Sequence, residues 1–251
     1  PNKKMSILQS YADLGKIDKF WDRKEDINSL VIDSGTFTMN HSELNIDIDD
    51  YKNYLQKYSH LFDLYFNFDK NYTEFGGPDN YRYQKELEDA GLRPVPVVKD
   101  IYEELEDIRD MGYTYIALGT PQIKTIDDVA VAMRKVENTG VKIHLLGETD
   151  YEILTTFPIN SVDATSWTKT GAHGELLFWN PEGETDRIYL EERMKFNDDI
   201  VKYSTYKYKK ELDNYFEKFG LIYEDLLKPV VGDLYKGLVN LDYFITLEEK
   251  V

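Results

Sequence analysis

Residues 29–35 read SLVIDSG. The apolar residues Leu30, Val31 and Ile32 are followed directly by Asp33 and then by the small residues Ser34 and Gly35. A short apolar run rich in β-branched residues predicts a buried strand. A carboxylate at the end of such a strand borders an apolar interior, where backbone N–H groups or a partner charge can hold it and shift its pKa. The stretch therefore predicts a parallel strand that delivers an acidic group to one edge of a sheet.

Similar runs recur along the chain, separated by polar segments with helical spacing. Several of these helical segments end in glycine just before the next strand, as at Gly91, Gly112 and Gly140. Strand and helix in alternation predict a parallel sheet, because each parallel crossover needs a connection about as long as a helix. The predicted strands are 5–12, 29–35, 62–69, 93–98, 113–119, 142–147, 160–166 and 174–179.

This pattern predicts an α/β fold, specifically a (β/α)8 TIM barrel with a C-terminal helical extension. The length of 251 residues is usual for such a barrel. An open doubly wound sheet is the alternative, disfavoured because no GxGxxG turn follows the first strand. We place the barrel core at 1–185 and the C-terminal helices at 186–251, packed on the barrel as one domain. The segment 198–220 reads as one long amphipathic stretch that ends at Gly220.

Composition restricts the partners and the kinds of site. The chain has 47 acidic and 30 basic residues, a net charge of −17, so its average field repels phosphate and any nucleic-acid contact must be local. Candidates for a local basic patch are Arg93, Lys99, Lys124 and Lys169. For each of them, an ordinary solvated position on the surface is the first expectation. The absence of cysteine excludes disulfides and thiolate zinc sites. No run has the roughly 20 apolar residues of a membrane span, so we expect a soluble, cytoplasmic protein without a membrane partner.

Three aspartates follow predicted strands: Asp33, Asp69 and Asp163. In a (β/α)8 barrel, the carboxyl ends of the strands carry the reacting groups, so these side chains are expected at one opening. Taken alone they fit a two-carboxylate glycosyl transfer, a divalent-metal site built from carboxylates, or a sugar-binding pocket. The histidines show no HxH or HExxH spacing, and no GxSxG or Walker motif is present.

The motifs around these aspartates resemble those of the tRNA-guanine transglycosylases and of their relatives that insert 7-deazaguanine bases into DNA. VIDSGTFT (31–38) is similar to the family's Asp-Ser-Gly-Gly-Phe-Gln motif, and VKIHLLGETDYEIL (141–154) resembles a second conserved stretch. In SVDATSWTKTGAHGELLF (161–178), Asp163 stands six residues before Lys169, eight before Gly171 and eleven before Gly174. The family's nucleophilic aspartate stands at those distances from an Arg and two Gly residues. FNFD (66–69) and IALG (116–119) resemble two further strands of the family.

The resemblance implies roles for individual residues. Asp163 is the expected nucleophile, and Asp33 binds the base and serves in acid/base steps. No cofactor and no metal is implied. The expected substrate-binding residues are Asp69, Ser34, Gly35, Leu118, Gly119, His144, Gly147, Lys169, Gly171 and Trp167.

The sequence departs from the family at several positions. The family's zinc subdomain of three Cys and one His cannot exist here, Thr36 replaces a glycine, and Thr120 replaces a glutamate. The glutamine that usually follows the fourth strand has no counterpart in RPVPVVKD (93–100). The chain is therefore closest in character to the zinc-less DNA-modifying relatives of phage and bacteria, which would place it in a host cytoplasm.

The expected function is base exchange in nucleic acid, in which guanine is replaced by a 7-deazaguanine-type base through a covalent Asp–glycosyl intermediate. The expected partner is DNA rather than tRNA, together with the free base. A homodimer or an accessory subunit is compatible with the sequence. Three alternatives stay open: a base-excising DNA glycosylase, a non-catalytic nucleobase-binding or accessory barrel, and a carboxylate-metal hydrolase or lyase.

Overall fold

The structure, a computed structural model, describes residues 4–16, 23–70, 76–119, 123, 125–165, 167, 171, 173–190 and 201–251. The chain divides into two compact units, Pro1–Asp163 and Ala164–Val251. The sequence analysis drew its boundary at 185, whereas this division falls directly after Asp163, so the segment 174–185 belongs to the second unit. Each unit is described by itself.

The described residues of the first unit form a three-stranded and a four-stranded sheet, with the strands of each in chain order and every pair parallel. A parallel bridge between Phe66 and Val95 links the two sheets. All carboxyl ends of these strands consequently point the same way, as the sequence pattern predicted. The strands are β1 (Met5–Ser10), β2 (Ile27–Asp33), β3 (Leu64–Tyr65), β4 (Val97–Val98), β5 (Tyr115–Leu118), β6 (Lys142–Leu145) and β7 (Ser161–Val162).

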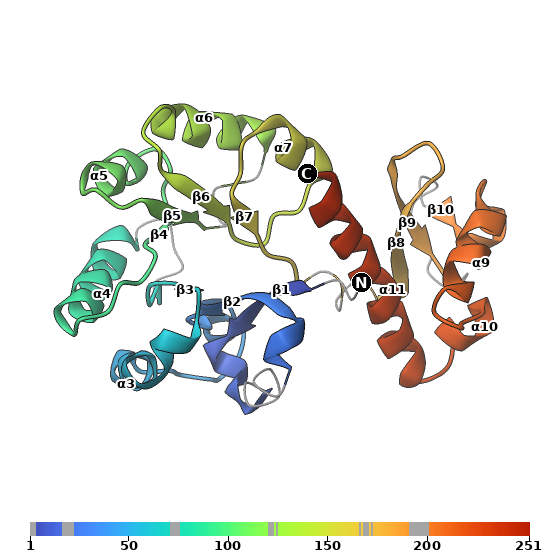
Figure 1. The fold of residues 1–251 in the computed structure, drawn as a ribbon, viewed down its shortest axis with the longest axis horizontal. Helices are drawn as coiled ribbons and strands as arrows, with labels where there is room; N and C mark the ends of the chain where they lie inside the picture. The colour runs from blue at the N-terminus through green and yellow to red at the C-terminus, as the bar shows by residue number, and fades with distance from the viewer. Residues whose placement is uncertain are drawn as a thin grey trace. The chain divides into compact units, whose positions relative to one another are not determined.

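Helices separate the strands, and Figure 1 shows α5 and α6 outside the sheet of β4 to β7. Helix α6 begins with a capping box between Thr125 and Asp128 and buries Val129, Ala132 and Val136 against the core. This spacing of three and four residues is the apolar stripe of an amphipathic helix. The helices are α2 (Thr36–Asn40), α3 (Ile48–Tyr58), α4 (Gly77–Asp89), α5 (Leu105–Asp110), α6 (Ile126–Val136) and α7 (Tyr151–Thr156), with short 3-10 helices η1 (Tyr11–Lys16), η2 (Lys24–Asp26) and η3 (Ser59–Leu61).

The second unit contains a small sheet in the order β10-β9-β8, in which β8 and β9 are antiparallel and β9 and β10 are parallel. Its strands are β8 (Glu175–Trp179), β9 (Thr185–Tyr189) and β10 (Val201–Lys202). The prediction of C-terminal helices over 186–251 was wrong for 186–189, which belong to β9. The turn explains the difference: the Asn180 side-chain oxygen accepts hydrogen bonds from the N–H groups of Glu182 and Glu184, and Gly183 has a φ of 84°. These features close a hairpin that a helical periodicity does not reveal.

The rest of the second unit is helical. Its helices are η4 (Tyr203–Thr205), α9 (Lys209–Glu217), α10 (Tyr223–Leu226) and α11 (Val231–Lys250). The predicted continuous segment 198–220 is therefore a strand, a 3-10 turn and then a helix over its described residues, and Gly220 ends it with a φ of 69°.

Helix α11 is tied to β8 through the fully buried Asn240. The side-chain oxygen of Asn240 accepts from the N–H of Leu177 at 2.8 Å, and its side-chain nitrogen donates to the carbonyl of Glu175 at 3.2 Å. These two backbone groups of β8 point away from β9, toward an edge that no strand covers among the described residues. Asn240 therefore satisfies one N–H and one carbonyl of that edge.

The fold is thus mixed α/β, with parallel sheets and intervening helices, as predicted. The described pairings leave the first unit's sheet open, and β8 pairs antiparallel with β9, so a closed (β/α)8 barrel is not seen. None of the helices in the described part of the chain is long and apolar enough to cross a membrane.

Candidate active site

Polar residues gather at the carboxyl ends of the first unit's parallel strands. A charged residue or a glycine lies at the carboxyl end of each strand from β2 to β7, or within four residues after it. Because the strands are parallel, these positions share one edge of the sheet, which is where ligands bind in α/β folds. In chain order, these positions are Asp33, Asp69, Lys99, Gly119, Gly147 and Asp163.

Asp69 is buried and fully engaged by neighbouring donors. Its Oδ1 accepts from the hydroxyl of Ser34 at 2.8 Å and from that of Thr36 at 2.9 Å. Its Oδ2 lies 2.5 Å from the ammonium of Lys99, which is itself 1% exposed. Burial acts to raise the pKa of Asp69, but the charge and hydrogen bond of Lys99 and the two hydroxyls hold it below its usual value. Asp69 is therefore an ionised carboxylate with bonds on both oxygens.

Asp33 has the opposite electrostatic character. Its Oδ2 accepts from the N–H of Gly35 at 3.0 Å. Burial and then the negative charge of Asp69 raise the pKa of Asp33 to about 7, and Asp163 adds to the rise. A carboxyl group with this pKa can both donate and accept a proton near neutral pH, as general acid/base work requires. Asp33 is therefore within electrostatic reach of both of the other predicted aspartates.

Asp163, which follows β7, is held through one oxygen. Its Oδ1 accepts from the N–H of Gly147 at 2.8 Å and lies 3.3 Å from Nε2 of His144. The Asp163 side chain is 14% exposed, while that of His144 is 4% exposed. Among the described residues, both of these contacts fall on Oδ1, so Oδ2 is the oxygen available for chemistry.

His144 connects Asp163 to two hydroxyl groups. Its Nδ1 lies 2.6 Å from Oγ of Ser161, and that Oγ lies 2.7 Å from the hydroxyl of Tyr115. His144 pairs with Ser161 between β6 and β7, and its ring packs against that of Phe66 with centroids 4.8 Å apart. The sheet thus aligns a continuous chain of polar groups that ends on the carboxylate.

The predicted glycines have two different structural roles. Gly35 has a φ of 85°, and a Cβ placed there would lie 2.8 Å from Cβ of Ala12, so only glycine fits comfortably. Gly119 lies beside Lys99: a Cβ at Gly119 would be 3.0 Å from Cδ of Lys99. Gly119 therefore makes room for the buried lysine stem. Leu118 packs its side chain in the apolar core, and its carbonyl accepts from the N–H of Leu146 at 3.1 Å.

Two predicted residues lie in the second unit. A Cβ at Gly171 would lie 3.2 Å from the backbone nitrogen of Gly237, so Gly171 sits close against α11. Trp167 lies near the same helix: a Cβ at Gly237 would be 3.7 Å from its ring, and its carbonyl accepts from the amide of Asn240 at 3.5 Å. Lys169, like Lys124 of the predicted basic patch, lies outside the described residues.

Lys99 and Thr36 have roles at the site that differ from those expected from the sequence. The sequence analysis treated it as a solvated surface cation, whereas it is buried in an ion pair with Asp69. Thr36, noted only as a departure from a glycine, is a hydrogen-bond donor to the same carboxylate. The rule that selected the aspartates would also have placed Lys99 at this edge, because Lys99 directly follows β4, although it does not reveal that the side chain is buried. Ser161 and Tyr115 lie inside strands, where no local pattern marks them.

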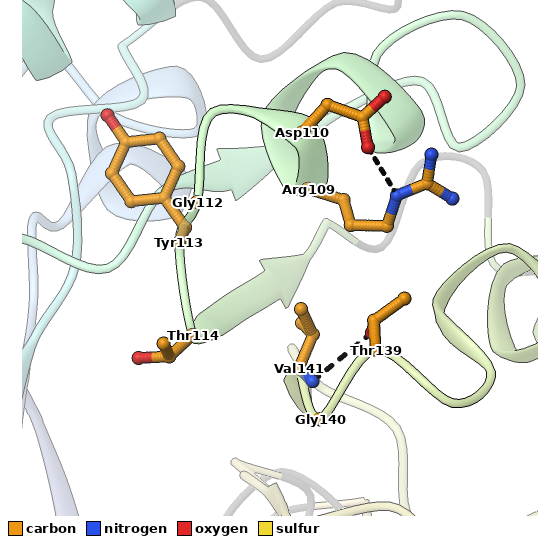
Figure 2. A pocket seen from close by; sticks show the side chains of 8 residues that line it. All are labelled: Arg109, Asp110, Gly112, Tyr113, Thr114, Thr139, Gly140 and Val141. Atoms are coloured by element: carbon orange, nitrogen blue, oxygen red, sulfur yellow. Dashed lines mark hydrogen bonds and ion pairs between the residues drawn. The ribbon is translucent and has the colours of Figure 1, made fainter.

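Within the described part of the chain, no three His, Asp or Glu side chains are grouped so as to hold a metal ion. A pocket of about 250 Å³ lies at the other end of the sheet, between the end of α5 with the loop before β5 (109–114) and the loop before β6 (139–141). Figure 2 shows Arg109 paired there with Asp110, and the N–H of Val141 bonded to the hydroxyl of Thr139. Two of the lining side chains also bond to neighbouring helices: the guanidinium of Arg109 donates to the carbonyl of Lys135, and the hydroxyl of Tyr113 donates to the carboxylate of Glu88. The pocket lies at the amino ends of the strands, away from the aspartates.

The candidate site therefore rests on the residues of the first unit alone. No protein-family model, no curated protein and no solved structure gave a significant match to this chain.

Proposed function

We propose that the protein is a pentosyltransferase that exchanges a base in nucleic acid, replacing guanine with a 7-deazaguanine-type base. DNA is the favoured substrate. One observation carries the proposal: two carboxyl groups lie at the same sheet edge, of which burial raises the pKa of Asp33 to about 7, while Gly147 and His144 hold Asp163 through Oδ1. A carboxyl group with a pKa near neutrality can serve as an acid/base group, and a carboxylate held in a fixed orientation can serve as a nucleophile.

The first half of the exchange breaks the glycosidic bond. Oδ2 of Asp163 attacks C1′ of the sugar, the C1′–N bond breaks with its electron pair going to the guanine, and the proton of Asp33 passes to the departing base. The product is an ester between Asp163 and C1′. Because the sugar stays attached to the protein, water is not needed to complete the step.

The second half reverses these roles. The incoming base loses the proton of its ring nitrogen to Asp33, that nitrogen attacks C1′, and the ester bond breaks to restore the carboxylate of Asp163. Asp33 ends the cycle protonated, as it began. A base inside a duplex cannot reach such a site, so the target nucleotide has to be extruded from the helix.

Asp69 and Lys99 would act together in reading the base. The resemblance assigns base recognition to Asp69, but both of its oxygens already accept hydrogen bonds from Ser34, Thr36 and Lys99. The neighbouring base would therefore meet an ion pair and two hydroxyls instead of an unpaired carboxylate. This difference supports a base with a recognition edge other than that read in the tRNA enzymes.

The finer fold that goes with this function is a closed (β/α)8 barrel. Parallel strands in chain order, with the reacting groups at their carboxyl ends, support that architecture.

We propose a cytoplasmic protein, since base exchange in DNA requires access to the cellular nucleic acid.

The experiment incubates the full chain with a guanine-containing oligonucleotide, single- or double-stranded, and a radiolabelled 7-deazaguanine base. Incorporation of label into DNA by the wild type, and a covalent protein–DNA adduct lost in Asp163→Ala, are expected. A tRNA substrate run in parallel tests the choice of nucleic acid. Circular dichroism checks that the alanine variant is folded, and full activity of that variant would refute the assignment.

The alternatives give different outcomes in the same experiment. Abasic sites without incorporation indicate an excising glycosylase. Binding of the base without turnover on any nucleic acid indicates a non-catalytic barrel. Activity that disappears on chelation, and returns with a divalent ion, indicates a metal-dependent hydrolase or lyase.

A further inference from the structure

The contacts of Asp163 distinguish its two oxygens. The N–H of Gly147 and the Nε2 atom of His144 both contact Oδ1, at 2.8 and 3.3 Å. Gly147 has a φ of 71°, a left-handed conformation that turns its N–H toward the carboxylate. A carboxylate held by two groups on one oxygen cannot rotate freely, so its other oxygen has a defined direction.

The contact with Asp163 determines which ring nitrogen of His144 carries the hydrogen, and the hydroxyls behind His144 can match that tautomer. An ionised carboxylate only accepts hydrogen bonds, so the contact with Oδ1 requires a hydrogen on Nε2. In a neutral imidazole Nδ1 is then an acceptor, which the hydroxyl of Ser161 at 2.6 Å can satisfy as donor. Oγ of Ser161 in turn accepts from the hydroxyl of Tyr115 at 2.7 Å. Each hydrogen bond in this series is then donated in the direction of Asp163, so every group has a donor or acceptor role that matches its neighbour.

We propose that His144 is a positioning residue for Asp163: Ser161 and Tyr115 hold it in the Nε2–H tautomer, so that it fixes Oδ1 and directs Oδ2 at the sugar carbon. The resemblance suggested substrate binding for His144, and the geometry points to the nucleophile instead. This inference deepens the proposed function and rests on it.

The same two donors would assist both halves of the exchange. In the ester, Oδ1 is the carbonyl oxygen and keeps its contacts with His144 and Gly147. When the second base attacks C1′, the carboxylate of Asp163 is the leaving group, and hydrogen bonds to Oδ1 stabilise the charge that returns to it. Loss of His144 should therefore slow turnover while it leaves substrate binding nearly unchanged.

The first test measures the tautomer without any substrate. The ring nitrogens of 15N-histidine-labelled wild type are recorded by NMR at pH 7.5, and the signals absent in His144→Phe are those of His144. The expected result is a hydrogen on Nε2 and none on Nδ1 in the wild type, and a mixed tautomer population in Ser161→Ala. A wild type with the hydrogen on Nδ1 would overturn the proposal.

The second test compares turnover in two variants of the same position. His144→Gln keeps a donor that can reach Oδ1, whereas His144→Phe keeps a ring and loses the donor. We expect His144→Phe to lower kcat about 10- to 100-fold with KM changed by less than about threefold, the effect of one hydrogen bond to a charged group, and His144→Gln to recover most of kcat.

Two outcomes of the turnover test count against the proposal: equal kcat values for the Gln and Phe variants, or a loss confined to KM. If the wild type exchanges no base, the proposed function fails. The NMR result is then still decisive for the contact itself, because a hydrogen on Nε2 supports His144 as the donor to Asp163 and a hydrogen on Nδ1 excludes it.

Discussion

The ammonium of Lys99 lies 2.5 Å from a carboxylate oxygen of Asp69, and both side chains are at most 5% exposed. A buried pair of this kind is strongly coupled, because removing one partner leaves the other charge without compensation in a poorly solvated place. The ion pair also connects β4 to the segment after β3, so it joins the two sheets of the first unit at their carboxyl edge.

Lys99→Met should lower the free energy of unfolding by about 3–5 kcal/mol at pH 7, because the carboxylate of Asp69 then stays buried without its cation. Urea denaturation followed by fluorescence measures the loss. The double variant Asp69→Asn with Lys99→Met is the control, and it should be more stable than Lys99→Met alone. If the double variant loses as much stability as Lys99→Met and Asp69→Asn lose separately, added together, the pair is not coupled.

Asp33 makes the stability of the protein depend on pH. Its pKa is about 7 in the folded chain and about 3.9 in an unfolded one. Its contribution is fully present below about pH 4, where both states are protonated, and is lost as pH rises toward 7, since the unfolded chain releases the proton first. Wild type should therefore lose stability relative to Asp33→Asn as pH rises from 4.5 to 7.5. A difference between the two proteins that does not change with pH would contradict the raised pKa.

Gly35 should tolerate alanine less well than Gly91 does, although both have a φ near 85°. A Cβ at Gly91 meets nothing within 4 Å, whereas a Cβ at Gly35 would lie 2.8 Å from Cβ of Ala12. We expect Gly91→Ala to cost about 1–2 kcal/mol for backbone strain alone. Gly35→Ala should cost a further ~1–3 kcal/mol for the steric clash. Equal denaturation midpoints for the two variants would show that the loop relieves the clash.

Thr125 should stabilise the start of α6 through its hydroxyl. That hydroxyl accepts from the N–H of Asp128 at 3.3 Å, while the Asp128 carboxylate accepts from the N–H of Thr125 at 2.9 Å. Thr125→Ala is expected to cost about 1 kcal/mol in thermal or urea unfolding. Thr125→Ser keeps the hydroxyl and should retain most of that stability. If serine is as destabilising as alanine, the methyl group rather than the cap is responsible.

The parts of the fold that depend on local chemistry could be predicted from the sequence. Gly91 and Gly112 were expected to end helices, and they follow the ends of α4 and α5 with φ values of 84° and 89°. The same expectation was wrong for Gly140, because α6 already ends at Val136 and Asn138 takes a left-handed φ of 59° before it. Each predicted strand segment contains a strand, because short apolar runs bounded by turn residues report burial directly. The electrostatic interaction of Asp163 with Asp33 likewise follows from their shared position after parallel strands.

The parts that depend on distant residues could not be predicted in this way. The burial of Lys99 depends on Asp69 and on the space left by Gly119, 20 positions later in the sequence. The strand 185–189 depends on the turn at Asn180 and on pairing with β8. Nothing in a single segment signals such partners, so the sequence pattern assigned these residues their average environment, which for a lysine is the surface.

Asn240 has a consequence for association of the chain with itself. The apolar strand β8 would otherwise present unpaired N–H and carbonyl groups along one edge, and such an edge recruits further strands into intermolecular sheets. Proteins usually guard these edges with charge, proline or a bulge. Here the amide of Asn240, 63 positions beyond Leu177, occupies two of these groups, so a residue of a helix shields this part of the edge from pairing with another chain.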